Sequence, residues 1–280
     1  MLIKEQKMKI TRKLIVLFSI LMITASSLFA DVTLSKKTKD LLEELMTLKI
    51  SLMAESNPRT SLSLLDNWVS KTKADFDSLT EVEQMAITNM IDCERYTYNS
   101  RLPDTKKMLD KLLSAQCKLN KKYIEAHKNE KLDPWILLSA GSVTSCYMAL
   151  EPLKTAFTYG YWVRDLFTEV VERAPNMSHA QLNLAQWYYY CPGILGGSKK
   201  KAKELFRKSF EVATTDHDRF ESAVLMSQLA FDEKDNANYE KYIAIAEAIS
   251  PNNYYLHDII NTNKTRKESV FKYHGHKAEE

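Results

Sequence analysis

The chain of 280 residues has only six glycines and seven prolines, too few to build the tight turns and hairpins of a β-rich domain. Its formal net charge of +3 comes from the first 30 residues, which hold five of the 39 basic residues and one of the 36 acidic ones. The remainder has 34 basic and 35 acidic residues, a net charge of −1. This balance argues against a nucleic-acid partner, whose binding depends on clustered Lys and Arg.

Residues 1–30 have the pattern of a secretory signal peptide. Basic residues precede an uncharged run from Leu14 to Phe29, and the run ends at the small residue Ala30. It is shorter than the roughly 20 residues of a membrane-spanning helix. We expect export to the bacterial periplasm with cleavage after Ala30, and contact with the membrane only if the signal stays uncleaved. No cysteine lies near the break, which excludes a bacterial lipoprotein anchor.

Four amphipathic helices are predicted in the segment that follows the signal. Apolar residues recur at helical spacing from Lys39 to Glu55, and a second helix follows Asn57-Pro58 to about Ala74. Thr80-Glu81-Val82-Glu83 is a capping box that opens the third helix. The fourth begins after Leu102-Pro103-Asp104.

Helix pairs are predicted in the segment that follows. A charged stretch at 128–131 is the expected hinge before it, and Asp133-Pro134 has the cap-then-proline order of a helix start. The helix from there to about residue 149 has unusually small residues on one face, which indicates a close neighbouring helix. Its partner is expected to start at Pro152.

Two further helices, joined by a glycine loop, are predicted from Pro175 to Ala213. Leu184-Ala185-x-x-Tyr188, followed by Ala202-x-x-x-Phe206-x-x-Ser209, resembles the tetratricopeptide repeat, a helix pair of about 34 residues. The turn departs from that pattern, because about five residues are inserted as Pro-Gly-Ile-Leu-Gly-Gly. A second repeat is readable from Ala223 to Pro251 at uninterrupted spacing, and a degenerate one lies upstream.

The resemblance covers about residues 134–252, and it implies an all-α fold in which antiparallel helix pairs stack as a short solenoid. A short helix at 254–260 is expected to cap the open end. The predicted organisation is a signal peptide (1–30), an N-terminal helical region (31–130), repeats with their capping helix (131–263) and a flexible tail (264–280).

The resemblance also implies a concave binding surface, lined by the first helix of each repeat. Aromatic and amide side chains on such a surface suit the recognition of a peptide or a small ligand. The alternative is that the tyrosines pack under the glycine loop. The residues placed on this surface are His179, Leu182, Gln186, Tyr189, Tyr190, Glu221, Val224, Gln228 and Phe231.

The glycine loop carries Ser198, Lys199 and Lys200 at a helix start, where an anion or carboxylate could bind. Its Gly-Ser-Lys order and the helix before it do not fit a Walker A loop. The simplest interpretation is a turn that folds the chain back.

Nothing in the sequence predicts an enzyme, a cofactor or a metal site. The four cysteines are scattered, the histidines lack metal-binding spacing, and no nucleophile motif is present. The cysteines are expected either as buried thiols or as disulfides between helices.

The first functional hypothesis is an exported scaffold that binds a protein or peptide in the cell envelope. The second is a small-ligand-binding or transport-accessory protein that partners a periplasmic substrate-binding protein. Exported helical-repeat proteins of that kind are similar in architecture, although they are commonly lipid-anchored. A deep, closed pocket favours the second hypothesis and an open groove favours the first.

Overall fold

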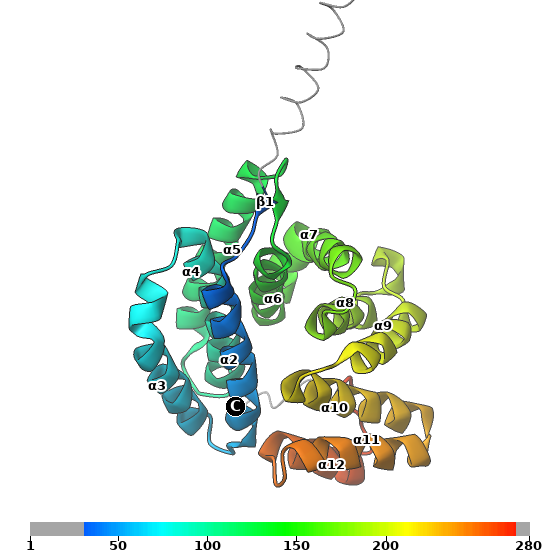
Figure 1. The fold of residues 1–280 in the computed structure, drawn as a ribbon. Helices are drawn as coiled ribbons and strands as arrows, with labels where there is room; N and C mark the ends of the chain where they lie inside the picture. The colour runs from blue at the N-terminus through cyan, green and yellow to red at the C-terminus, as the bar shows by residue number, and fades with distance from the viewer. Residues whose placement is uncertain (1–30, 273–280) are drawn as a thin grey trace, which may run out of the picture.

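The computed structural model describes residues 31–272, and this part of the chain is almost entirely helical. Successive helices pack as pairs, and the pairs stack on one another (Figure 1). The predicted all-α class and the stacking of helix pairs are therefore confirmed. The signal peptide predicted at 1–30 lies outside the described residues. The helices are α2 (Lys36–Ala54), α3 (Pro58–Asp77), α4 (Glu81–Asn99), α5 (Lys106–Ala126), α6 (Pro134–Leu150), α7 (Pro152–Arg173), α8 (Ser178–Tyr190), α9 (Lys199–Val212), α10 (Asp216–Glu233), α11 (Asn236–Ile249) and α12 (Tyr254–Thr265).

The capping box predicted at Thr80 is present and also joins two helices. The Glu83 carboxylate accepts hydrogen bonds from the backbone N–H of Thr80 (3.0 Å) and from the backbone N–H of Ser35 (2.8 Å). It also accepts from the hydroxyl of Thr38 (2.9 Å). Because Ser35 is the N-cap of α2, one buried carboxylate fixes the starts of α2 and α4 side by side.

A two-residue parallel ladder joins β1 (Asp31–Val32) to β2 (Lys131–Leu132). Next to it, the buried Asp133 carboxylate caps α6 through the N–H of Trp135 (3.0 Å) and accepts from the N–H of Leu34 (3.1 Å). The charged stretch predicted as a hinge therefore runs into a paired strand. The main hydrophobic core also extends continuously across residue 130, from Leu34 to Leu184.

The stack closes on itself. Helix α10 and helix α12 both pack against α2, so that the helices form a ring (Figure 1). The side-chain amide of Asn253 donates to the backbone carbonyl of Ile50 at this contact (3.2 Å). The helix predicted to cap an open end is longer than expected, and it lies against α2, the first of the described helices, instead.

The start of the predicted flexible tail is packed. Helix α12 continues to Thr265, and the Phe271 side chain beyond it is buried and stacks on Tyr189 with ring centroids 4.3 Å apart. The prediction overlooked that Val270 and Phe271 supply apolar surface in an otherwise charged segment. Residues 273–280 lie outside the described residues.

Candidate functional site

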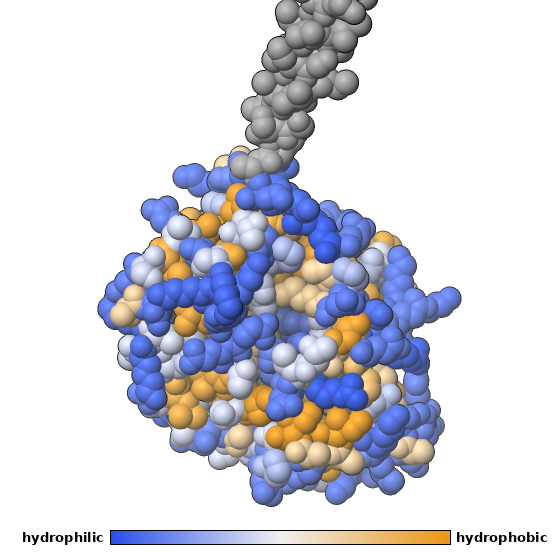
Figure 2. Space-filling model, in the orientation of Figure 1, coloured by the Kyte–Doolittle hydropathy of each residue, from blue (hydrophilic) through white to orange (hydrophobic). Residues whose placement is uncertain are grey.

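A cleft of about 320 Å³ lies inside the ring of helices. Its walls come from α2, α4, α6, α8 and α10, the first helix of each pair, together with Tyr255 of α12. Figure 2 shows hydrophilic and hydrophobic residues side by side around the middle of the molecule. The apolar lining residues are Met53, Met90, Ala149, Leu182, Val224 and Leu225, and the polar ones include Lys49, Tyr96, Thr97, Ser142, Asn183 and Gln186.

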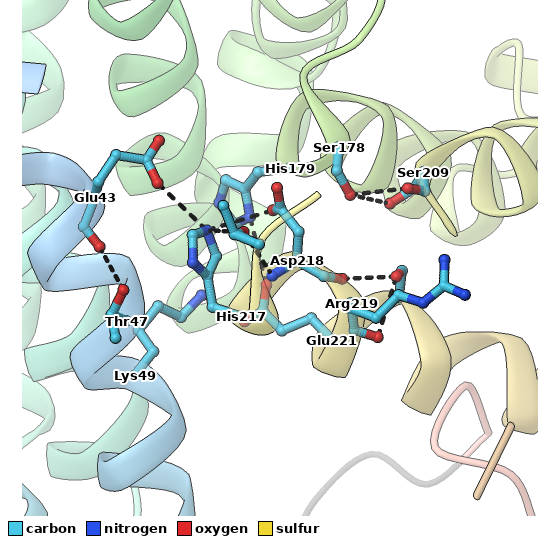
Figure 3. Close-up of polar contacts among 12 residues, drawn as sticks. Glu43, Thr47, Lys49, Ser178, His179, Ser209, His217, Asp218, Arg219 and Glu221 are labelled. Atoms are coloured by element: carbon cyan, nitrogen blue, oxygen red, sulfur yellow. Dashed lines mark hydrogen bonds and ion pairs between the residues drawn. The ribbon is translucent and has the colours of Figure 1, made fainter. Parts of the chain in front are cut away.

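Four ionisable side chains from four helices meet at this cleft. The ammonium of Lys49 on α2 lies 2.6 Å from a carboxylate oxygen of Glu221 on α10 and 3.7 Å from Glu94 on α4. The other oxygen of Glu221 lies 3.4 Å from Nδ1 of His179 on α8. Figure 3 shows how His179, Lys49 and Glu221 point toward one another. We call Lys49, Glu94, His179 and Glu221 the central cluster.

The environment shifts the pKa values of the two carboxyl groups of the central cluster in opposite directions. Burial alone would raise the pKa of Glu221, but Lys49 and His179 outweigh burial and lower that pKa well below its usual range. Burial raises the pKa of Glu94, and Lys49 offsets only part of this effect. For Lys49 the two carboxylates outweigh burial and raise the pKa. Lys49 and Glu221 therefore form a charged pair, while Glu94 lacks a full counter-ion.

Several polar groups at the cleft have no hydrogen-bond partner among residues 31–272. The hydroxyl of Ser142 is buried without one, and Nδ1 of buried His179 has only its 3.4 Å contact with Glu221. The side chains of Gln186, Tyr96 and Tyr255 also make no hydrogen bond within this range. A buried unpaired polar group is costly, so unpaired groups around one cleft are groups that a ligand could satisfy.

Two cysteines lie in the cleft wall. Cys93 on α4 and Cys146 on α6 are both free thiols, as are Cys117 and Cys191. A hydrogen bond with Cys146, together with burial, raises the pKa of the Cys93 thiol. No disulfide joins the described helices. Across residues 31–272, no group of three or more His, Cys, Asp or Glu side chains is placed to hold a metal ion.

Part of the surface predicted from the sequence faces this cleft. His179, Leu182 and Gln186 of α8 lie in its wall, as do Glu221 and Val224 of α10. The register assigned to these two helices therefore brings their residues together.

The other predicted surface residues lie elsewhere. Tyr189 is buried against Phe271, beneath the ammonium of Lys199, which is 3.1 Å from the ring centroid. Gln228 is buried and exchanges hydrogen bonds with Asn263 at 2.9 Å. Tyr189 and Gln228 therefore contact the last described helix and the segment after it, whose position was not predicted from the sequence. Phe231 packs on Tyr239, and Tyr190 is half exposed.

The glycine loop turns the chain without reaching the cleft. Gly196 has a φ of +93°, and a Cβ on Gly197 would collide with the carbonyl of Cys191. Ser198 caps α9 through the N–H of Lys201 (3.3 Å), and Lys199 donates to the carbonyl of Tyr189. Lys200 is exposed. Ile194 at the tip is 93% exposed, so the loop projects outward.

Most of the cleft residues from the first half of the chain could not be recognised from the sequence. Lys49 stands between Leu48 and Ile50, and a charge inside an apolar helix stretch was the available signal. Glu94 and Ser142 had no such signal in the sequence, because their role depends on the ring of helices that brings them to the cleft.

Comparison with protein-family models, curated proteins and solved structures finds no match to this chain. Between residues 31 and 272, no helix combines the length and the apolar character needed to cross a bilayer.

Proposed function

We propose that this chain binds a small ligand in the cleft at the centre of its helical ring. The observation that carries the proposal is the contact of α10 and α12 with α2, since it brings residues from both ends of the stack of helix pairs to one cleft. The cleft volume of about 320 Å³ falls at the lower end of the range of about 300–1,000 Å³ for small-molecule pockets.

The lining supports binding rather than catalysis. It combines apolar walls with a few unpaired polar groups, the composition expected of a ligand pocket. The proposal includes export to the periplasm through the signal at 1–30, and it follows the tetratricopeptide-like, transport-accessory hypothesis. In that setting a periplasmic substrate-binding protein is the partner with which the ligand is exchanged.

A protein-binding scaffold in the envelope is the second candidate function. It is favoured by the outer face of α7, where Leu153 is 96% exposed, Phe157 86% and Tyr161 50%. Large apolar side chains gathered on one exposed helix face are typical of interaction sites. Replacing Leu153 and Phe157 with serine would then abolish capture of an envelope partner while leaving the cleft intact.

The proposal is tested by filling the cleft with a large side chain. Ser145 lines the cleft and its hydroxyl donates to the carbonyl four residues earlier, as does the hydroxyl of exposed Ser70 on α3. Ser145→Trp and Ser70→Trp are therefore matched variants inside and outside the ring. Native mass spectrometry of protein purified from its own cell envelope is expected to detect a bound small molecule in wild type and Ser70→Trp, and none in Ser145→Trp. A wild-type protein that carries no ligand, or a ligand retained by Ser145→Trp, contradicts the proposal.

A further inference from the structure

We propose that the ligand of the central cleft is a small aliphatic monoamine whose ammonium pairs with Glu94. This inference rests on the proposed function and names the chemistry of the site. It starts from the balance of charge inside the ring.

Carboxylates outnumber ammonium groups in the central cluster. Lys49 is the single lysine there, and its ammonium sits 1.1 Å closer to Glu221 than to Glu94, at 2.6 Å against 3.7 Å. Two more carboxylates lie near the start of α10. The imidazole of His217 on α10 lies 3.5 Å from Asp218 of the same helix and 4.0 Å from Glu43 of α2. Glu94 is thus the carboxylate of the central cluster that shares Lys49 at the longer distance.

The charge balance selects the sign of the ligand. Charges a few ångström apart interact strongly in the partly buried environment of a protein. A ligand carboxylate or phosphate would be repelled by Glu94 and Glu221, while an ammonium would be attracted to them. Since Lys49 is already engaged with Glu221, it is poorly placed to receive an anion.

A separate observation points to a ligand with a polar group in the cleft. The Ser142 hydroxyl lines the cleft, its residue is only 7% exposed, and it has no hydrogen-bond partner among the described residues. An ammonium has three donors and no acceptor, so it needs acceptor oxygens in addition to one carboxylate. The rings of Tyr96 and Tyr255 in the same wall can add cation–π attraction.

The apolar residues of the cleft indicate the chemistry of the ligand beyond its ammonium group. Met90, Leu182 and Val224 offer apolar contact to a hydrocarbon stem. Only one carboxyl group of the central cluster is held at the longer distance from Lys49, which favours one amine over two. No group of His, Cys, Asp and Glu residues within 31–272 is arranged for a metal ion.

Three probes of equal length test the assignment: hexylamine, hexan-1-ol and hexanoate, titrated calorimetrically at pH 7 and low salt. Wild type is expected to bind hexylamine at least tenfold more tightly than hexan-1-ol, and hexanoate most weakly. Glu94→Gln is expected to lower the affinity for hexylamine at least tenfold and to leave that for hexan-1-ol unchanged. Glu125→Gln, an exposed carboxylate on α5, serves as the matched control and is expected to match wild type.

The outcomes separate the two proposals. If hexanoate binds as tightly as hexylamine and Ser145→Trp abolishes both, the cleft binds ligands but the amine assignment fails. If Glu94→Gln retains the wild-type affinity for hexylamine and its native circular dichroism, the assignment also fails. If no probe binds wild type, the amine assignment fails, while the cleft proposal is judged by the native mass spectrometry above. If Ser145→Trp binds hexylamine as wild type does, the amine is not bound in the cleft and the assignment fails.

Discussion

The ammonium of Lys49 lies 2.6 Å from the carboxylate of Glu221, and this pair joins the first helix of the described chain to α10. Both side chains are largely buried, with 11% and 13% of their surface exposed. Burying two charges is costly, so the pair is favourable only while both members are present.

We therefore expect Lys49→Ala to lower the free energy of unfolding by about 3–5 kcal/mol, because it leaves Glu221 buried without its cation. The double variant Lys49→Met with Glu221→Leu is expected to regain more than half of that loss. Lys36→Ala removes an exposed pair with Asp40 and is expected to cost at most about 0.5 kcal/mol. Urea denaturation at pH 7 measures all three, and equal losses for Lys36→Ala and Lys49→Ala would contradict the role of the buried pair.

The capping carboxylate of Glu83 predicts a specific acid sensitivity. Burial opposes ionisation, but hydrogen bonds from Ser35 and Thr80 outweigh it and lower the pKa of Glu83 to about 2. Its folded pKa is below the unfolded value of about 4.3, so its stabilising contribution is complete above about pH 4.3 and is lost as pH falls toward 2. Glu83→Gln is expected to destabilise the protein at pH 7 and to differ little from wild type near pH 2. Exposed Glu81→Gln is the control, and a Glu83→Gln effect independent of pH would refute this account.

The buried carboxyl group of Asp92 predicts the opposite dependence of stability on pH. Burial raises the pKa of Asp92 to about 6, although Arg95 at 3.4 Å offsets part of it, and one carboxylate oxygen has no hydrogen-bond partner among the described residues. A raised carboxyl pKa means that stability is lost as pH rises from about 4 to about 6. Asp92→Asn should therefore stabilise the protein by about 1–3 kcal/mol at pH 8, and this gain should vanish near pH 4. Thermal unfolding at both pH values checks the sign, and destabilisation at pH 8 would exclude this explanation.

Two glycines in neighbouring helices give a matched test of packing. A Cβ on Gly141 of α6 would collide with the buried ring of Phe167 on α7, whereas a Cβ on Gly160 of α7 would have Met148 as its nearest contact at 3.9 Å. Gly141→Ala is expected to destabilise by about 1–3 kcal/mol through overpacking. Gly160→Ala is expected to be neutral or to stabilise by up to about 1 kcal/mol, because alanine is the better helix former. Urea midpoints compare them, and a reversed order would mean that α6 and α7 are not packed as described.

Local patterns in the sequence were sufficient to predict the helices. The capping box at Thr80 and the cap-then-proline order at Asp133 each open a helix where expected, because caps and periodicity depend on neighbours in the sequence. The repeat register also brought His179 and Glu221 to one surface. Their role in binding stays a prediction.

What the sequence could not predict are contacts between distant segments. Nothing near Lys49 indicates that it meets Glu221, and nothing near Phe271 indicates that it stacks on Tyr189. The first contact exists because the stack of helix pairs curves until α10 and α12 meet α2, and the second because the segment after α12 lies against α8. The small curvature per pair that produces this closure is not visible in any short sequence window.

Closure of the ring also changes how the protein unfolds. An open row of repeats gains stability from each nearest-neighbour interface and can fray from either end. Here the first and last of the described helices, α2 and α12, pack together, so opening at one seam exposes surface on both sides of the molecule. We expect loss of any one helix pair to leave a gap that its neighbours cannot close, so that the described chain melts as one cooperative unit. Within residues 31–272 the number of helix pairs is thereby fixed by geometry, because the contact of α10 and α12 with α2 leaves no room for a further pair between them.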